Sequence, residues 1–291
     1  MIDTTGSFSP LRLRDVLIFR LQARLERHRY QQSGYVYERT PLDSEQTRKV
    51  ILVEATSMLD RVKVMRVFDF AGVVEAVGEV GQMVEGLQLR ARQAGPAVER
   101  AKNDEIGDSE EELDDDYDPP VKRLSSSSEG ADGEMGRLGM LIVDSITSVV
   151  SPVMSNSQIQ GQALLTSFMR SLHHLTGRHH LCTILVNAAV GLNTSNNPEH
   201  QLRPEEHVSI FSSTLGKPAL GKTFTYLVDT SIFMSAVPRT TQDATAAFAD
   251  SGESFQKALI LEILKDRRGS REGRWAAFDI ADGVKLVPCH G

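Results

Sequence analysis

The sequence contains little of what defines several protein classes. Its 291 residues include two cysteines, Cys182 and Cys289, too few for a disulfide framework, and no cysteine–histidine cluster has the spacing of a zinc or haem site. No apolar run approaches the roughly 18 residues that a membrane-spanning helix needs, and the N-terminus lacks a secretory signal pattern. We therefore expect an intracellular protein with no membrane partner, no zinc and no haem.

The composition is otherwise that of a globular protein, except in one stretch. Hydrophobic residues make up 40% and charged residues 24% of the chain, whose formal net charge is −7. The run from Asp104 to Asp118 is acidic and holds no basic residue, so the rest of the chain is slightly basic. This run belongs to a low-complexity segment, residues 95–136, which we interpret as a disordered insertion. A docking site for a basic partner is the alternative.

The parts on either side, residues 1–94 and 137–291, read as one interrupted α/β fold. Ser9 and Pro10 are typical of a helix start, and Phe70 to Val84 has helical periodicity. Leu138–Asp144 and Leu181–Asn187 are continuous apolar segments, typical of buried parallel strands. We also predict a helix over Gln158–Thr176 ended by Gly177, and strands at Val62–Phe68, Thr230–Val237, Ala258–Leu264, Trp275–Ile280 and Val284–Val287, the last pair joined at Asp282-Gly283. These elements predict a mostly parallel sheet flanked by helices, followed by antiparallel hairpins.

An aspartate ends the first of the two apolar strands. A carboxylate at the carboxyl edge of a parallel sheet can hold the water shell of a nucleotide-bound Mg²⁺. Asp144 is therefore a candidate magnesium ligand through water, and Asp144 and Ser145 are candidate nucleotide-binding residues. The structural alternative is that Asp144 caps the turn after the strand.

Several segments occur in an informative order. They are Ile2–Leu13, Leu141–Ser145, a strand ending at Asn187, Lys217–Lys222, Asp229–Met234 and Phe278–Val284. Together they resemble the RecA-type recombinases, and especially the D-type branch of the eukaryotic recombinase paralogues. The resemblance implies a RecA-like fold, a role in homologous-recombination DNA repair in the nucleus, ATP and Mg²⁺ as ligands, and DNA and other paralogues as partners.

Three departures from that family concern catalysis. Active members carry a water-activating glutamate where this chain has Thr5, and a glutamine that senses the γ-phosphate where it has Asn187-Ala188. Threonine is no general base, and alanine has no polar group for a phosphate. The family's phosphate-binding strand, loop and helix precede the segment that resembles Ile2–Leu13, so we expect the phosphate cradle to be missing here. Asn187 remains a candidate nucleotide contact.

The segment Gly216–Thr223 matches the P-loop pattern G-x-x-x-x-G-K-T letter for letter. A working P-loop needs a buried strand before it and a helix after it, so that backbone N–H groups face the phosphates. The preceding residues 208–213 are short and half polar, and the match follows the strand of Asp144. We therefore interpret the match as a coincidence.

Candidate DNA contacts come from a loop and from a basic cluster. The resemblance places DNA-contacting loops at about Val150–Gln158 and Val190–Lys217, and the second contains Arg203 and Lys217. Near the C-terminus, Arg267, Arg268 and Arg271 are candidate phosphate contacts, with a solvated hairpin tip as the alternative. The arginine-rich helix Leu11–Arg29 is interpreted as a solvated charged face, with phosphate contact as the alternative.

Some isolated residues have simpler interpretations. We expect the pairs His173-His174 and His179-His180 to be polar residues on a helix surface, since no ligand-spaced partners accompany them. Cys182 is predicted to be a core thiol and Trp275 a packing residue.

Three functional hypotheses follow. The first is a non-catalytic or weakly nucleotide-binding subunit of a recombinase-paralogue complex. The second is a DNA-dependent ATPase, in a full-length form or with Gly216–Thr223 as its P-loop. The third is that the sequence is an incomplete version of a longer ATP-binding paralogue.

Overall fold

The structure is a computed structural model of the whole chain, and it describes residues 1–32, 45–93, 138–191, 209–211, 214, 216–248 and 256–289. The chain divides into two compact units, Met1–Gly78 with Gly139–Gly291, and Glu79–Leu138. Helix α3, Phe70–Gln93, belongs to the first unit up to Gly78 and to the second beyond it. The predicted acidic insertion, residues 95–136, lies outside the described residues.

A four-stranded parallel sheet carries the first half of the fold. Its strands are β1, Ile2–Asp3, β2, Met65–Arg66, β3, Met140–Asp144, and β4, Cys182–Val186, in the order β2-β1-β3-β4. All three neighbouring pairs are parallel. The predicted parallel sheet is therefore confirmed, although the strand predicted over Val62–Phe68 is only two residues long.

Apolar burial is concentrated on one face of this sheet. Ile2, Leu141 and Val143 are at most 1% exposed, whereas Met140, which points to the opposite face, is 48% exposed. Helices α4, Ile146–Asn156, and α5, Gln158–His179, follow β3 and pack against each other. The Phe168 ring of α5 meets the Phe70 ring edge-on. These contacts place helices beside the strands, as the sequence predicts.

The last turn of α5 differs from the prediction. The helix does not end at Gly177 but continues to His179, and His180 adopts a left-handed conformation with φ of 53°. The N–H of His180 donates to the carbonyl of Thr176, which satisfies one of the last helical carbonyls. A histidine thus provides the ending that is most often made by glycine.

The C-terminal half forms a separate antiparallel sheet in the order β10-β9-β8-β7. Its strands are β7, Thr230–Pro238, β8, Lys257–Asp266, β9, Trp275–Ala281, and β10, Lys285–Pro288. Asp282 and Gly283 both have positive φ, as the tight turn between β9 and β10 requires. All four predicted strands and this turn are confirmed.

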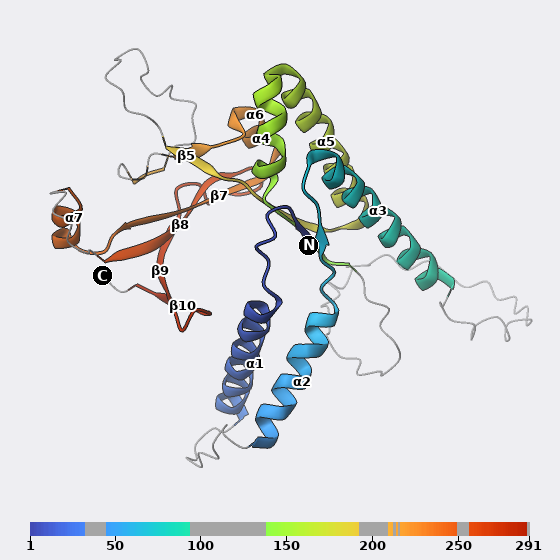
Figure 1. Cartoon of the computed structure of the whole chain (residues 1–291). Coiled ribbons are helices and arrows are strands. Elements are labelled where there is room, and N and C mark those ends of the chain that lie inside the picture. Colours follow the sequence, from blue (N-terminus) through green and yellow to red (C-terminus); the bar gives the residue numbers. More distant parts are fainter. Residues whose placement is uncertain are drawn as a thin grey trace, which may run out of the picture. The chain divides into compact units, whose positions relative to one another are not determined.

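The remaining elements are smaller. Helices α1, Pro10–Gln32, and α2, Glu45–Asp60, pack side by side around Leu21, Ile51 and Ala55 (Figure 1). Strands β5, Ala189–Gly191, and β6, Gly216–Pro218, form an antiparallel pair, which the seven-residue helix α6, Gly221–Leu227, follows. Helix α7 spans Thr241–Phe248. No helix among the described residues combines the length and hydropathy needed to cross a bilayer.

Candidate functional site

Polar side chains gather where the central strands of the parallel sheet end. Asp3 pairs with Asp144, and Asp144 pairs with Val186, the residue before Asn187. The structure therefore brings the predicted residues Asp144, Ser145 and Asn187 to one edge of the sheet. The carboxyl edge of parallel strands is where α/β proteins bind ligands, so this edge is the candidate site.

The carboxylate of Asp144 is the unengaged group of this edge. Among the described residues it accepts no hydrogen bond and forms no ion pair, and the residue is half-buried. The next peptide bond, Asp144–Ser145, is cis. The Ser145 N–H donates to the Thr4 hydroxyl over 2.7 Å, and the Ser145 hydroxyl accepts from the Ser148 N–H as the N-cap of α4. Ser145 is thus used by the fold, whereas the Asp144 carboxylate is open to a ligand.

Asp3, which was not among the predicted site residues, is fully buried beside Asp144. One carboxylate oxygen accepts from the N–H groups of Thr5 and Gly6, at 3.2 and 2.8 Å, and the other accepts from the Phe8 N–H at 3.3 Å. Burial would raise the pKa of Asp3, but these backbone donors and the Thr5 hydroxyl together lower it below the usual range. The carboxylate shapes the turn after β1 and offers little to a ligand.

Asn187 is oriented by a threonine of the neighbouring helix. The Thr147 hydroxyl donates to the Asn187 side-chain oxygen over 2.6 Å and accepts from the Ala188 N–H over 2.8 Å. The sequence does not reveal Thr147, the third residue after β3, because no local pattern shows that it contacts Asn187, forty positions later. Asn187 remains at the edge, but its amide oxygen already has a donor.

These residues fit a hydrated magnesium ion better than they fit a nucleotide phosphate. Mg²⁺ is usually bound through one or two carboxylates and keeps several waters, and here the Asp144 carboxylate is the available one, because Ser145 and Asn187 are already hydrogen-bonded within the fold. In the P-loop-like segment, however, Gly216–Pro218 is strand β6, paired antiparallel with β5. Only Ala219 and Leu220 then separate that strand from α6, so the segment Gly216–Gly221 is mostly strand and not the loop that a P-loop wraps around a phosphate.

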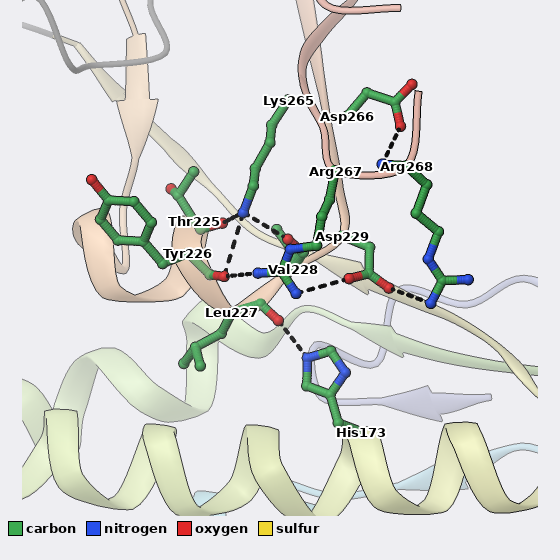
Figure 2. Close-up of polar contacts among 10 residues, drawn as sticks. All are labelled: His173, Thr225, Tyr226, Leu227, Val228, Asp229, Lys265, Asp266, Arg267 and Arg268. Atoms are coloured by element: carbon green, nitrogen blue, oxygen red, sulfur yellow. Dashed lines mark hydrogen bonds and ion pairs between the residues drawn. The ribbon is translucent and has the colours of Figure 1, made fainter. Parts of the chain in front are cut away.

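The predicted basic cluster near the C-terminus is largely paired with carboxylates (Figure 2). Arg267 and Arg268 contact the two oxygens of Asp229 at 3.1 and 3.3 Å. Arg271 binds both oxygens of the buried Asp266, and the hydrogen bond from Arg271 lowers the pKa of Asp266. Lys217 is exposed on β6, and Arg203 lies outside the described residues. DNA contact by these five residues stays a prediction.

A buried lysine beside this cluster fixes the end of α6 (Figure 2). Lys265 is 8% exposed, and its ammonium group donates to the carbonyls of Thr225 and Val228 at 2.7 and 2.8 Å. Burial, and then the charge of Arg267, lower the pKa of Lys265. From α5, a ring nitrogen of His173 contacts the Leu227 carbonyl. The C-terminal sheet and α5 therefore meet at the last turn of α6.

Two of the isolated residues differ from their interpretation. His179 is not a surface residue, since it is 2% exposed, and its Nδ1 has no partner among the described residues. Cys182 is exposed rather than buried, because β4 is an edge strand of the parallel sheet and its residue faces the open side. The described residues contain no cluster of three or more histidine, cysteine or acidic side chains arranged to hold a metal.

Comparison with known proteins gives matches to solved structures alone. No protein-family model matches the chain, and no curated protein does. Among the 33 matching chains of solved structures, the crystal structure of the RadB recombinase is 14% identical, with a TM-score of 0.46. That match covers 99% of this chain and 77% of the RadB chain. Identity and TM-score at this level establish neither a family nor a function for the chain.

Proposed function

We propose that the chain is a RecA-type recombinase paralogue that acts in homologous-recombination DNA repair as a non-catalytic or weakly nucleotide-binding subunit. The observation that carries the proposal is the unengaged carboxylate of Asp144 at the carboxyl edge of the parallel sheet. In the resemblance Asp144 corresponds to the magnesium-binding aspartate of the RecA-type recombinases, and Asn187 directly follows the neighbouring strand β4. One carboxylate can bind a hydrated magnesium ion, but it cannot by itself catalyse phosphoryl transfer.

The groups around Asp144 support the non-catalytic part of the proposal. Thr5 stands where active recombinases carry a base, and its hydroxyl is hydrogen-bonded to Asp3 and Ser7. Ala188 offers a methyl group where a phosphate sensor is expected. A water molecule at this edge would therefore find no group that could accept its proton from either position. Hydrolysis would then depend on the site of another subunit.

The resemblance also supplies the proposed partners and place of action. We propose that the chain binds other recombinase paralogues and single-stranded or branched DNA, directly or through those partners, in the nucleus. ATP and Mg²⁺ would bind chiefly in a partner's site, where Mg²⁺ neutralises charge on the transferred phosphate. In this chain, Asp144 would contribute at most an outer contact to the ion's waters.

Reconstitution with a recombinase paralogue from the same organism tests this proposal. We expect a stable complex whose DNA-stimulated ATP hydrolysis is lost when the partner's own magnesium-binding aspartate is replaced. Asp144→Asn should change the rate of the complex less than twofold, as should the matched control Asp282→Asn in the β9–β10 turn. A complex whose hydrolysis disappears with Asp144→Asn contradicts the non-catalytic role.

The competing ATPase hypothesis makes a different prediction for the P-loop-like segment. If Gly216–Thr223 cradled phosphates, Lys222→Ala would abolish nucleotide binding while leaving the fold intact. Since β6 pairs with β5 and leaves no such loop, we expect the same nucleotide affinity for Lys222→Ala and for the wild type. Isothermal titration with ATP and Mg²⁺ distinguishes the two outcomes.

A further inference from the structure

Three residues form a row across one face of the antiparallel sheet. Phe233 of β7 pairs with Glu262 of β8, and Glu262 pairs with Trp275 of β9. Directly opposite residues of antiparallel strands have their side chains on the same face, so an acidic residue stands between two aromatic ones. Glu262 is 1% exposed, which is rare for a glutamate.

Both carboxylate oxygens of Glu262 are used by one segment of the chain. The Ser209 hydroxyl donates to Oε2 over 2.6 Å, and the Ile210 N–H donates to Oε1 over 2.8 Å. Ser209 is itself buried, and its oxygen accepts from the Phe211 N–H at 3.1 Å. Among the described residues no cation pairs with Glu262, so these neutral donors alone offset the loss of hydration of its charge.

The aromatic residues at the ends of the row hold the same segment. The Phe211 ring meets the Trp275 ring edge-on, with centroids 5.2 Å apart. Gly216 lies so close to Phe233 that a Cβ atom at residue 216 would be 2.9 Å from the ring. Residues 209–211 and Gly216 therefore lie along the row Phe233–Glu262–Trp275.

This segment ends the stretch that the resemblance identifies as DNA-contacting, Val190–Lys217. The start of that stretch is fixed as well, because Val190 in β5 pairs with Lys217 in β6. Glu262 thus lies under the C-terminal end of a stretch whose two ends are brought together. An apolar residue would fill the same position in β8 at less cost, since Ala258, Ile260 and Leu264 face the same way and are buried.

We propose that Glu262 is a positioning residue for nucleic-acid binding. Its carboxylate fastens Ser209 and Ile210 to the antiparallel sheet and so sets where Phe211 and Lys217 are presented to single-stranded DNA. This proposal rests on the proposed function in one respect, namely that the ligand is DNA. The fastening itself is a property of the free protein and is measurable without DNA.

Glu262→Gln is the direct test, because the amide removes the charge that strengthens both hydrogen bonds and puts an N–H group in place of one of the two accepting oxygens. Trp275 is the chain's single tryptophan and reports on Phe211. We expect a red shift of Trp275 emission and easier acrylamide quenching in the free variant. Affinity for fluorescein-labelled oligo-dT should fall about tenfold, as for one lost buried hydrogen bond to a charged group. Glu75→Gln, on the exposed surface of α3, is the matched control.

Variants of the donor separate positioning from simple loss of folding. Ser209→Ala removes the hydroxyl donor and should reproduce both effects more weakly, whereas Ser209→Thr keeps the hydroxyl and should restore both. Unchanged Trp275 emission in Glu262→Gln overturns the fastening, and shifted emission with wild-type DNA affinity overturns the positioning role. A wild-type chain that fails to bind oligo-dT contradicts direct DNA binding and the positioning role with it, while Trp275 still reports whether Glu262 fastens the segment.

Discussion

Replacing Lys265 with methionine should loosen the junction between α6 and the antiparallel sheet. The ammonium group is buried and donates to the carbonyls of Thr225 and Val228, and a longer contact of 3.4 Å reaches Tyr226 (Figure 2). These carbonyls belong to the end of a seven-residue helix that has no side-chain N-cap. A helix this short is not stable by itself, so contacts at its end carry much of its stability.

The expected size follows from two opposing effects. A hydrogen bond from a charged group contributes about 1.5 to 3 kcal/mol, and two of the Lys265 contacts are short. Part of this gain is offset, because burial lowers the pKa of Lys265 and thus disfavours its charged form. Methionine keeps the apolar packing of the side chain but donates nothing. We therefore expect the free energy of unfolding to fall by about 2 kcal/mol.

Urea unfolding followed by circular dichroism at pH 7 measures the change. Lys49→Met is the matched control, because Lys49 lies on the surface of α2 in an exposed pair with Glu45, worth about 0.3 to 0.5 kcal/mol. His173→Ala removes the contact from α5 to Leu227. Its change in the free energy of unfolding should not add to that of Lys265→Met, since both side chains contact the last turn of α6. A Lys265→Met variant that is no less stable than Lys49→Met would show that the Lys265 hydrogen bonds do not stabilise the end of α6.

Four further variants test other parts of the fold. Gly161→Ala should destabilise the chain by about 1 to 3 kcal/mol, because a Cβ atom at residue 161 would lie 2.6 Å from Met154 Cγ and 2.9 Å from Met154 Cα. Gly177→Ala, in open space within α5, should stabilise the chain by about 0.5 to 1 kcal/mol. Thermal melts that rank the two variants the other way would contradict this packing. The carboxylate of Asp3 has a lowered pKa, so its stabilisation is present above the unfolded value of about 3.9 and is lost as the pH falls through the folded value. Asp3→Asn should accordingly destabilise the chain at pH 7, and its free energy of unfolding should fall less steeply with pH below about pH 4 than that of the wild type. The same pH dependence in both proteins below about pH 4 counts against the turn described for Asp3. Asp144→Asn should leave urea stability within about 0.5 kcal/mol, because its carboxylate has no partner among the described residues, and a larger loss would show that it is structural.

Local sequence patterns predicted the strands well where burial and periodicity coincide. Leu138–Asp144 is a continuous apolar run, and the antiparallel strands end at glycine-containing turns, so both sheets were expected. The predicted end of α5 at Gly177 is wrong, because glycine is the commoner stop signal and nothing in the sequence shows that His180 adopts the left-handed conformation. The prediction of a buried Cys182 is wrong because an apolar run does not reveal whether its strand lies at the edge of a sheet.

The site was predicted in part for a similar reason. Asp144 follows its strand directly and was identified, whereas Thr147 and Asp3 act through hydrogen bonds between segments far apart in sequence. The pairing of Arg267 and Arg268 with Asp229 has no local signal either. Glu262 did have one: it occupies a core-facing position in the alternation of Ala258, Ile260 and Leu264, where a charged residue requires a buried partner.

ATP hydrolysis by the purified chain shows whether Asp144 belongs to a catalytic site. The assay compares the wild type with Asp144→Asn, in the presence of Mg²⁺ and with or without single-stranded DNA. We predict no DNA-stimulated hydrolysis by either protein, because Thr5 and Ala188 supply neither a base nor a phosphate sensor beside Asp144. DNA-stimulated hydrolysis by the wild type that Asp144→Asn abolishes would contradict the account and make the chain an ATPase in its own right.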